Sequence, residues 1–449
     1  MDIFSRTFSI INGLVSALTL PGLLVLCLVG LTAVVLALMS PRGRMIFFVI
    51  VVLCYAISMS GSKDDETGRV PLPGFMFSVA YALKWILLIP LILYGLIASI
   101  TGRGTSIITT FAIFTVCLYI FVRAVASGSW DRYFLWIFMM LGLPGFGAQI
   151  AKELGVSNIF KYLFFLGYCV IFLAILQLAL RHGTELRGYR YTGFMPNPNS
   201  MGAFLSCLIV PGLWVFFECS RTRLVVIILA VLAIMLIATG SRASACQVLP
   251  VAILIAMRYT KRPLMWISFM LMGTVILVSS TWFLSDQITA RFFSTSTSGR
   301  TDLWREYWTI GMETPFFGRG MGWIDEMNMY PPHNGFVFLF VESGLTGMIL
   351  MGLVLLFVIF RNPARKYYYM FPRQLLMRRF IFAQLIGFLI SGFFESWFIG
   401  IGYFELILFL FTIGIKDAVD REVNTLGHAY WDNSVFAMPA YDFGAVQTV

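Results

Sequence analysis

The stretch from Phe293 to Gly347 reads FSTSTSGRTDLWREYWTIGMETPFFGRGMGWIDEMNMYPPHNGFVFLFVESGLTG and interrupts an otherwise apolar chain. It carries a set of ionisable side chains, namely Arg300, Arg305, Arg319, Asp325, Glu326 and His333. The histidine is one of only three in the chain. Because the flanking segments are apolar, we expect chemistry to take place in this stretch. The pattern predicts half of an active site at the outer face of a membrane.

The composition of the whole chain sets its class. Of its 449 residues, 59% are hydrophobic and only 12% are charged, and the mean hydropathy is +0.85. Soluble domains carry roughly twice that charged fraction. We therefore predict an all-α, polytopic transmembrane helical bundle. Residues 1–415 form its multi-span domain, with a large extracytoplasmic loop at 285–335 that contains an amphipathic helix, and residues 416–449 form a weakly ordered cytoplasmic tail.

Apolar runs long enough, or nearly so, to cross about 30 Å of hydrocarbon recur along the chain. They lie near 9–39, 45–59, 75–100, 105–125, 132–149, 159–180, 201–217, 224–239, 243–257, 264–284, 336–360, 380–396 and 402–415. The first run is either one span or a tight hairpin broken at Pro21-Gly22. About 12 to 14 crossings are therefore expected.

Basic loops orient the predicted bundle, because Lys and Arg accumulate in the short cytoplasmic loops of membrane proteins. The most basic loop is 361–379. Placing this loop in the cytoplasm leaves five segments outside: 60–74, 126–131, 181–200, 240–243 and 285–335. Two of them, 181–200 and 285–335, still carry several arginines. This departure from the usual bias indicates a function for both loops.

Charge and cysteine spacing argue against two classes of partner. Basic loops that face anionic headgroups account for the formal net charge of +10, so no nucleic-acid partner is expected. None of the seven cysteines has CxxC spacing, so neither a disulfide framework nor a zinc site is indicated.

The outside loop 181–200 supplies arginines and asparagines. Arg187 and Arg190 precede Asn197 and Asn199, which stand just before the next span. The arginines are expected to bind an anionic substrate; alternatively, they face lipid headgroups. Asn199 is a candidate for substrate binding, although both asparagines are also suited to cap the following helix.

Arg242 lies in the sequence Thr239-Gly-Ser-Arg242, between two apolar runs. An arginine at such a place is costly unless it is paired or faces water. Its planar guanidinium suits bidentate binding of phosphate. The alternative is an arginine that snorkels from the end of a helix.

Arg300 follows Ser298-Gly299 and stands at the start of a predicted helix from Thr301 to Met312. The face of this helix at i, i+3, i+4 and i+7 spacing is formed by Trp304, Tyr307, Trp308 and Gly311. Such a face indicates an interfacial amphipathic helix. Its N-terminus beside Arg300 favours an anion, although a plain surface helix is the alternative.

His333 and Asn334 precede the next span, and Glu342 lies near the top of that span. A histidine at a membrane–water boundary is able to accept a proton at neutral pH. Asn334 is predicted either to bind substrate or to cap the helix. Glu342 is predicted to bind substrate or to orient a polar partner or the backbone nearby.

Nucleotide and metal motifs are absent: the sequence holds no P-loop, no dinucleotide-binding glycine motif, no HExxH and no GxSxG. Outside a cell, a glycosyl donor has to arrive already activated, and a lipid pyrophosphate is the natural carrier. Arginines would hold the pyrophosphate while one base deprotonates a sugar hydroxyl.

In order and type, these elements resemble the bacterial O-antigen ligase and polysaccharide polymerase superfamily. The matching residues are Gly193-Phe-Met-Pro-Asn-Pro-Asn199, Thr239-Gly-Ser-Arg242, Ser298-Gly-Arg300 with Trp304, Pro315-Phe-Phe-Gly318-Arg-Gly320, and His333-Asn334 with Glu342-Ser-Gly344. The match is strongest from about residue 190 to residue 350, and each motif alone is short. Five motifs in this order, all on the predicted outer side, carry the resemblance.

The resemblance implies a multi-pass glycosyltransferase of the bacterial inner membrane with a periplasmic active site. It implies transfer from undecaprenyl pyrophosphate without nucleotide, metal or other cofactor. Arg242 and Arg300 would contact the pyrophosphate, and His333 would activate the acceptor hydroxyl or hold the donor. Expected partners are the lipid-linked oligosaccharide and membrane lipids, with a chain-length regulator and a flippase acting alongside.

Within the superfamily we favour the polymerase of an exopolysaccharide, capsule or O-antigen. A ligase that moves a finished glycan onto lipid A core remains open, as does a cell-wall glycan polymerase that relies on Asp325 or Glu326. The rival of another class is a non-enzymatic flippase for lipid-linked oligosaccharides. A transporter places its charges within the spans, whereas here they mostly lie in outside loops, with Lys84 and Glu395 as exceptions.

Overall fold

The computed structural model describes residues 40–59, 74–179, 186–187, 190–195, 197–219, 221–259, 300–395, 397 and 403–433. The runs expected at 9–39 and 264–284, the outside loop 60–73 and the pair Ser298-Gly299 lie outside these ranges.

The first half of the described chain is a series of apolar helices. In order they are α3 (Pro41–Met59), α4 (Gly74–Ile100), α5 (Ile107–Ala126), α6 (Trp130–Leu154), α7 (Val156–Ala179), α8 (Pro198–Trp214), α9 (Arg223–Ala238) and α10 (Arg242–Tyr259). A π-helical turn, Val215–Cys219, extends α8. A short antiparallel pair, β1 (Leu186–Arg187) and β2 (Arg190–Tyr191), joins α7 to α8.

The second half contains α13 (Arg300–Met312), α14 (Trp323–Glu326), α15 (Gly335–Phe360), the 3-10 turn η2 (Tyr368–Met370), α16 (Pro372–Gly392) and α17 (Phe404–Asn433). Among the described residues, eight helices are long and apolar enough to cross a membrane, namely α3 to α8, α15 and α16. Helices α9 and α10 are shorter and apolar. The predicted class, a polytopic helical membrane protein, is confirmed.

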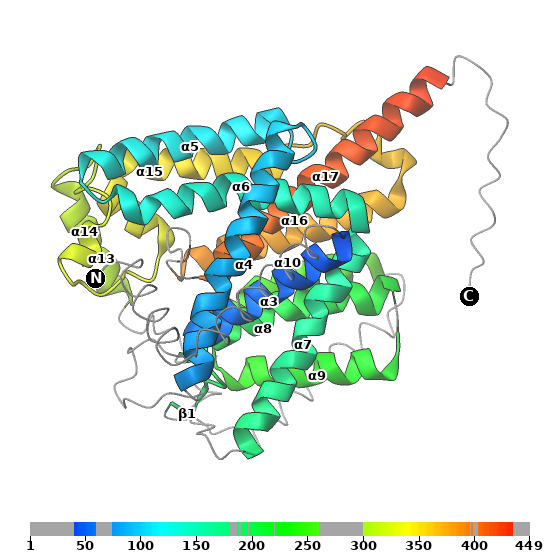
Figure 1. The fold of residues 1–449 in the computed structure, drawn as a ribbon, viewed down its shortest axis with the longest axis horizontal. Helices are drawn as coiled ribbons and strands as arrows, with labels where there is room; N and C mark the ends of the chain where they lie inside the picture. Colours follow the sequence, from blue (N-terminus) through cyan, green and yellow to red (C-terminus); the bar gives the residue numbers. More distant parts are fainter. Residues whose placement is uncertain are drawn as a thin grey trace, which may run out of the picture.

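The described parts of the predicted outside loops gather at one end of the bundle. Ser127 Oγ donates to the carbonyl of Met321 at 3.0 Å, and Arg190 Nε donates to the carbonyl of Thr239 at 2.7 Å. Figure 1 shows helices α13 and α14 and strand β1 at this end, on its left side. The basic loop 361–379 lies at the other end, where Arg361 Nη1 donates to Ser106 Oγ at 2.8 Å.

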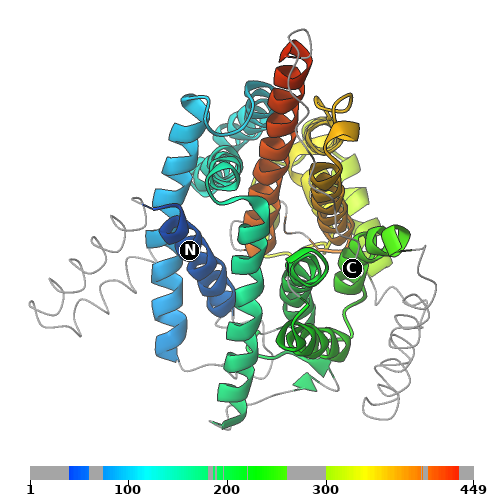
Figure 2. The same ribbon diagram turned by 90° about the vertical axis from the view of Figure 1, so that its right-hand side faces the viewer.

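The core of the bundle is built on close helix crossings. Helix α17 lies against α6, and in Figure 2 it stands between α4 on one side and α15 and α16 on the other. A Cβ added to Gly414 of α17 would lie 1.9 Å from the carbonyl oxygen of Pro144 in α6. Small residues allow such close backbone approach where lipid supplies no hydrophobic drive.

The expectation of a weakly ordered tail from Lys416 is wrong as far as Asn433, because α17 continues to that residue. Asp420 explains the continuation. Its carboxylate accepts from Lys416 Nζ and from Arg378 Nε of α16, each at 2.8 Å, and from the Tyr368 hydroxyl at 2.7 Å. These charges are paired in the interior, so the helix stays packed beyond its apolar part.

Candidate active site

Arg190 joins the strand pair to two neighbouring helices. Asn197 precedes α8 and caps it, because its side-chain oxygen accepts from the amide of Asn199 at 2.8 Å. Arg190 Nη2 then donates to Asn199 Oδ1 at 2.7 Å, while Nε binds the carbonyl of Thr239. The capping alternative holds for Asn197, and Asn199 is oriented by Arg190. The Arg187 backbone pairs with Arg190 across the strands.

The turn that carries Arg242 lies directly beside Arg190. Gly240 has a positive φ of 60°, and a Cβ at this position would lie 3.3 Å from Arg190 Nε. A larger residue at position 240 would therefore be strained and crowded. Arg242 is the first residue of α10 and is half-buried. The tertiary structure thus brings Arg190, Asn199 and Arg242 together at one turn.

A second group of charged side chains forms around Glu395, which lies between α16 and α17. Its Oε1 accepts from Arg300 Nη2 at 3.1 Å, and its Oε2 lies 3.1 Å from His333 Nδ1. Arg300 Nη1 also donates to the carbonyl of Phe394 at 2.7 Å. The exposed fractions of the three charged side chains are 20% for Arg300, 18% for Glu395 and 22% for His333. One carboxylate therefore holds the guanidinium and the imidazole side by side.

Glu395 sets the proton arrangement on His333. An ionised carboxylate only accepts hydrogen bonds, so Nδ1 carries the proton that points to Glu395. In the neutral imidazole, Nε2 then has a lone pair. The Tyr330 hydroxyl lies 3.2 Å from Nε2, and in this tautomer the hydroxyl is the donor. The unprotonated nitrogen of His333 therefore points away from Glu395, towards the exposed side of the loop.

Helix α13 holds the backbone of the loop before His333. Trp304 Nε1 donates to the carbonyl of Pro332 at 2.7 Å, and the Tyr307 hydroxyl donates to the carbonyl of Tyr330. Burial, helped by the negative charges of Glu306 and Glu342, raises the pKa of Tyr307 to about 12. Tyr307 therefore keeps its donor proton across the physiological range.

The helix expected at 301–312 is confirmed, but its aromatic face meets protein rather than lipid alone. Tyr307 and Gly311 are buried, and a Cβ on Gly311 would lie 2.4 Å from the ring of Phe340 in α15. Trp308 packs on the same ring at a centroid distance of 4.5 Å. The helix is thus a brace between α15 and the His333 loop.

Asn334 takes the capping alternative. Its side-chain oxygen accepts from the amides of Phe336 at 2.9 Å and Val337 at 3.1 Å, and its side chain is buried. The cap fixes the start of α15 directly after His333. Asn334 therefore supports the site through the backbone.

Glu342 makes the contacts of the second role predicted for it, in which it orients a polar partner and the backbone nearby. Its side chain is fully buried. Oε2 accepts from the Tyr133 hydroxyl of α6 at 2.7 Å, and Oε1 accepts from the amide of Ile324 at 3.4 Å. Glu342 therefore ties α6 and α14 to α15 from inside the bundle.

The backbone of α15 is broken beside Glu342, where Gly344 has a φ of 71°. The motif Pro315–Gly320 enters the break. Gly320 donates to the carbonyl of Glu342 at 3.1 Å, and Leu345 donates to the carbonyl of Pro315 at 2.7 Å. The polar backbone groups released by the break are paired in this way, as the interior of a membrane protein requires.

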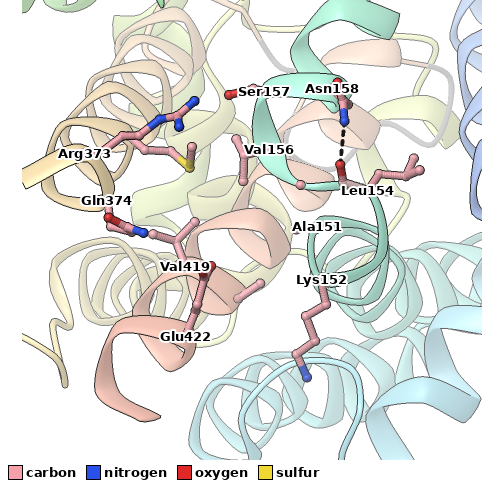
Figure 3. A pocket seen from close by; sticks show the side chains of 13 residues that line it. Ala151, Lys152, Leu154, Val156, Ser157, Asn158, Arg373, Gln374, Val419 and Glu422 are labelled. Carbon is pink, nitrogen blue, oxygen red and sulfur yellow. Dashed lines mark hydrogen bonds between the residues drawn. The ribbon is translucent and has the colours of Figure 1, made fainter. Parts of the chain in front are cut away.

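A pocket of about 290 Å³ lies at the opposite end of the bundle, between α6, α7, α16 and α17. Lys152, Arg373 and Glu422 are among its lining residues (Figure 3). None of the predicted site residues lines this pocket. It is therefore separate from the group around Glu395.

Two residues of the site were not selected from the sequence. Glu395 stands out in an apolar region, and an ionisable residue at such a place is a signal of function. Tyr330 carries no such signal. Lys84 is the other charged residue that does not fit the outside-loop pattern, and it is buried. It donates to Ser58 Oγ at 2.9 Å and lies over the rings of Tyr55, Tyr81 and Trp85. Its charge is accommodated by cation–π contacts in the α3–α4 interface.

The fold and the polar cluster at one end define a multi-pass helical membrane protein. Residues 224–352 match the family model described as O-Antigen ligase. This segment runs from α9 into α15 and includes Arg242, Arg300 and His333. The resemblance to the O-antigen ligase and polysaccharide polymerase superfamily is thereby confirmed. No curated protein matches the chain.

Proposed function

We propose that the protein is a polysaccharide polymerase of the bacterial inner membrane, acting at its periplasmic face. It transfers glycan from undecaprenyl pyrophosphate to a sugar hydroxyl of another lipid-linked repeat unit. The observation that carries the proposal is the bridge of Glu395 between Arg300 and His333. It places an anion-binding cation beside a base whose second ring nitrogen faces the Tyr330 hydroxyl.

Arg300 is assigned to the donor pyrophosphate. Among the described residues, Phe394 and Glu395 accept from two of the five N–H donors of its guanidinium, and we assign further donors to the anion. Arg242 is assigned to the same pyrophosphate from the α9–α10 turn, where Arg190 and Asn199 hold the backbone. Positive charge at the pyrophosphate stabilises the leaving group in the transition state.

His333 is assigned as the general base. Nε2 takes the proton of the acceptor hydroxyl, and the hydroxyl oxygen forms a bond to the anomeric carbon of the donor. The bond between that carbon and the pyrophosphate oxygen breaks, and its electron pair leaves with undecaprenyl pyrophosphate. Glu395 is a positioning residue, since it stabilises the imidazolium formed in this step.

Purified protein and an undecaprenyl-pyrophosphate-linked repeat unit test the proposal. We expect a ladder of longer glycans from the wild-type protein and none from His333→Ala. Arg305→Ala is the matched control, because Arg305 lies on α13 with an exposed fraction of 78% and pairs only locally with Asp302. A wild-type protein that produces no ladder, or a His333→Ala variant with full activity, would overturn the assignment.

The second candidate is an O-antigen ligase, which is favoured by the description of the matching family. The same reaction then ends on lipid A core, and the assay with this acceptor in place of a repeat unit decides between the two. Translocation of a fluorescent lipid-linked glycan in proteoliposomes, without any transfer, would instead support a flippase.

A further inference from the structure

The Tyr330 side chain occupies the one nitrogen of His333 that the proposed reaction needs. Its hydroxyl lies 3.2 Å from Nε2, and its ring centroid lies 5.2 Å from the imidazole centroid. While this bond exists, Nε2 is unable to accept a proton from a sugar. The hydroxyl of Tyr330 therefore stands where an acceptor hydroxyl has to arrive.

The backbone around Tyr330 is fixed, whereas its side chain is exposed. Tyr307 binds the carbonyl of Tyr330, and Trp304 binds that of Pro332. Pro331 and Pro332 further restrict the chain. In contrast, 64% of Tyr330 is exposed. An exposed side chain changes rotamer readily, so the ring is able to leave His333 without any change of the loop.

The ring of Tyr330 also has the chemistry of a sugar platform. Aromatic rings bury large apolar area with a specific geometry, and Tyr carries a polar end as well. The apolar face of a pyranose ring offers C–H groups to such a surface, and its hydroxyls remain at the edge. A sugar stacked on Tyr330 would have a hydroxyl close to His333 Nε2.

We propose that Tyr330 marks the acceptor subsite: its hydroxyl holds the place of the acceptor hydroxyl on His333, and its ring turns to stack on the acceptor sugar. The ligand class is a pyranose at the growing or receiving end of the glycan. This inference rests on the proposed function. It adds a residue that selects the acceptor and leaves binding of the donor to Arg300 and Arg242.

The kinetic test uses the full chain with Tyr330→Ala and Tyr330→Phe. The Ala variant loses the platform, so its KM for the acceptor should rise by about threefold to tenfold, with the KM for the donor unchanged. The Phe variant keeps the ring, and its KM for the acceptor should stay within about twofold of wild type. Tyr369→Ala is the matched control, because Tyr369 is 69% exposed at the other end of the bundle.

An acceptor KM that is unchanged in Tyr330→Ala would overturn the proposal. A Tyr330→Phe variant whose KM for the acceptor rises as much as that of Tyr330→Ala would also overturn it, since the hydroxyl and not the ring would then bind the acceptor. A KM that rises equally for donor and acceptor would also contradict it, because the effect would not be confined to one subsite.

A spectroscopic test needs no turnover and separates this inference from the proposed function. The chain holds three histidines, so ¹⁵N-labelled imidazole signals are few enough to assign with His333→Ala. Tyr330→Phe should shift the Nε2 signal of His333 and leave Nδ1 in place. Adding lipid-free repeat-unit oligosaccharide to wild type should likewise perturb Nε2. If the Nε2 signal responds neither to Tyr330→Phe nor to the oligosaccharide, the subsite is disproved. If it responds to both but no ladder of longer glycans forms, only the proposed function fails.

Discussion

The two carboxylate oxygens of Glu395 each lie 3.1 Å from a different partner, Oε2 from His333 Nδ1 and Oε1 from Arg300 Nη2. Because one planar group makes both contacts, a shift of the cation moves the base as well. The donor site and the acceptor base are thus coupled through one side chain. This coupling gives the first two predictions.

Glu395→Gln should lower kcat by about 10²-fold and change the pH–rate profile, because an amide does not stabilise an imidazolium as a carboxylate does. Glu395→Asp should restore part of the activity. The matched control is Glu326→Gln, since Glu326 is exposed on α14. Loss of activity in the control instead would favour the rival in which Glu326 is the essential acid.

Arg300→Lys should raise the KM for the lipid-linked donor by about tenfold or more. A lysine keeps the charge but lacks the fork that contacts Phe394, Glu395 and an anion together. Steady-state kinetics with varied donor measure the change. An unchanged donor KM would show that Arg300 acts on Glu395 alone and does not hold the pyrophosphate.

Gly344→Ala should lower the free energy of unfolding by about 1–3 kcal/mol, because an alanine is strained at a φ of 71°. Its Cβ would also lie 2.3 Å from the carbonyl oxygen of Phe316. Gly352→Ala in the same helix is the control, since a Cβ there meets nothing within 4 Å. Thermal unfolding in detergent compares the two, and equal midpoints would contradict the proposed fit of the loop into the α15 break.

Asp420→Asn should destabilise the protein by about 3–5 kcal/mol, because it leaves Lys416 and Arg378 without their shared carboxylate inside the protein. Asp302→Asn serves as the control, since Asp302 is 81% exposed. Limited proteolysis near the end of α17 reports whether this helix detaches. A thermal unfolding midpoint equal to that of the control would mean that Asp420 does not hold the helix.

Much of the fold was predictable from the sequence. The length and hydropathy of the apolar runs predicted most of the described spans to within a few residues, because a helix in lipid has to satisfy its own backbone. The exceptions are α16, which begins at Pro372 rather than at residue 380, and α17, which ends at Asn433 rather than at residue 415. The spacing of Trp304, Tyr307 and Gly311 predicted the helix at 301–312. The tail after Lys416 was missed because its charges suggest exposure, whereas Asp420 also pairs with Arg378 of α16 and Tyr368 of η2.

The sequence by itself determined that this is a multi-pass helical protein and that Arg190, Arg242, Arg300 and His333 fall between its apolar runs. Local chemistry suffices for that, since span length, loop charge and helix caps depend on neighbouring residues. Only the tertiary structure decided that Glu395 joins Arg300 and His333, which are 95 and 62 residues away along the chain. It likewise decided that Glu342 is buried and that Tyr330 covers Nε2. Contacts between distant residues depend on which helices pack together, and no local pattern in one sequence specifies that packing.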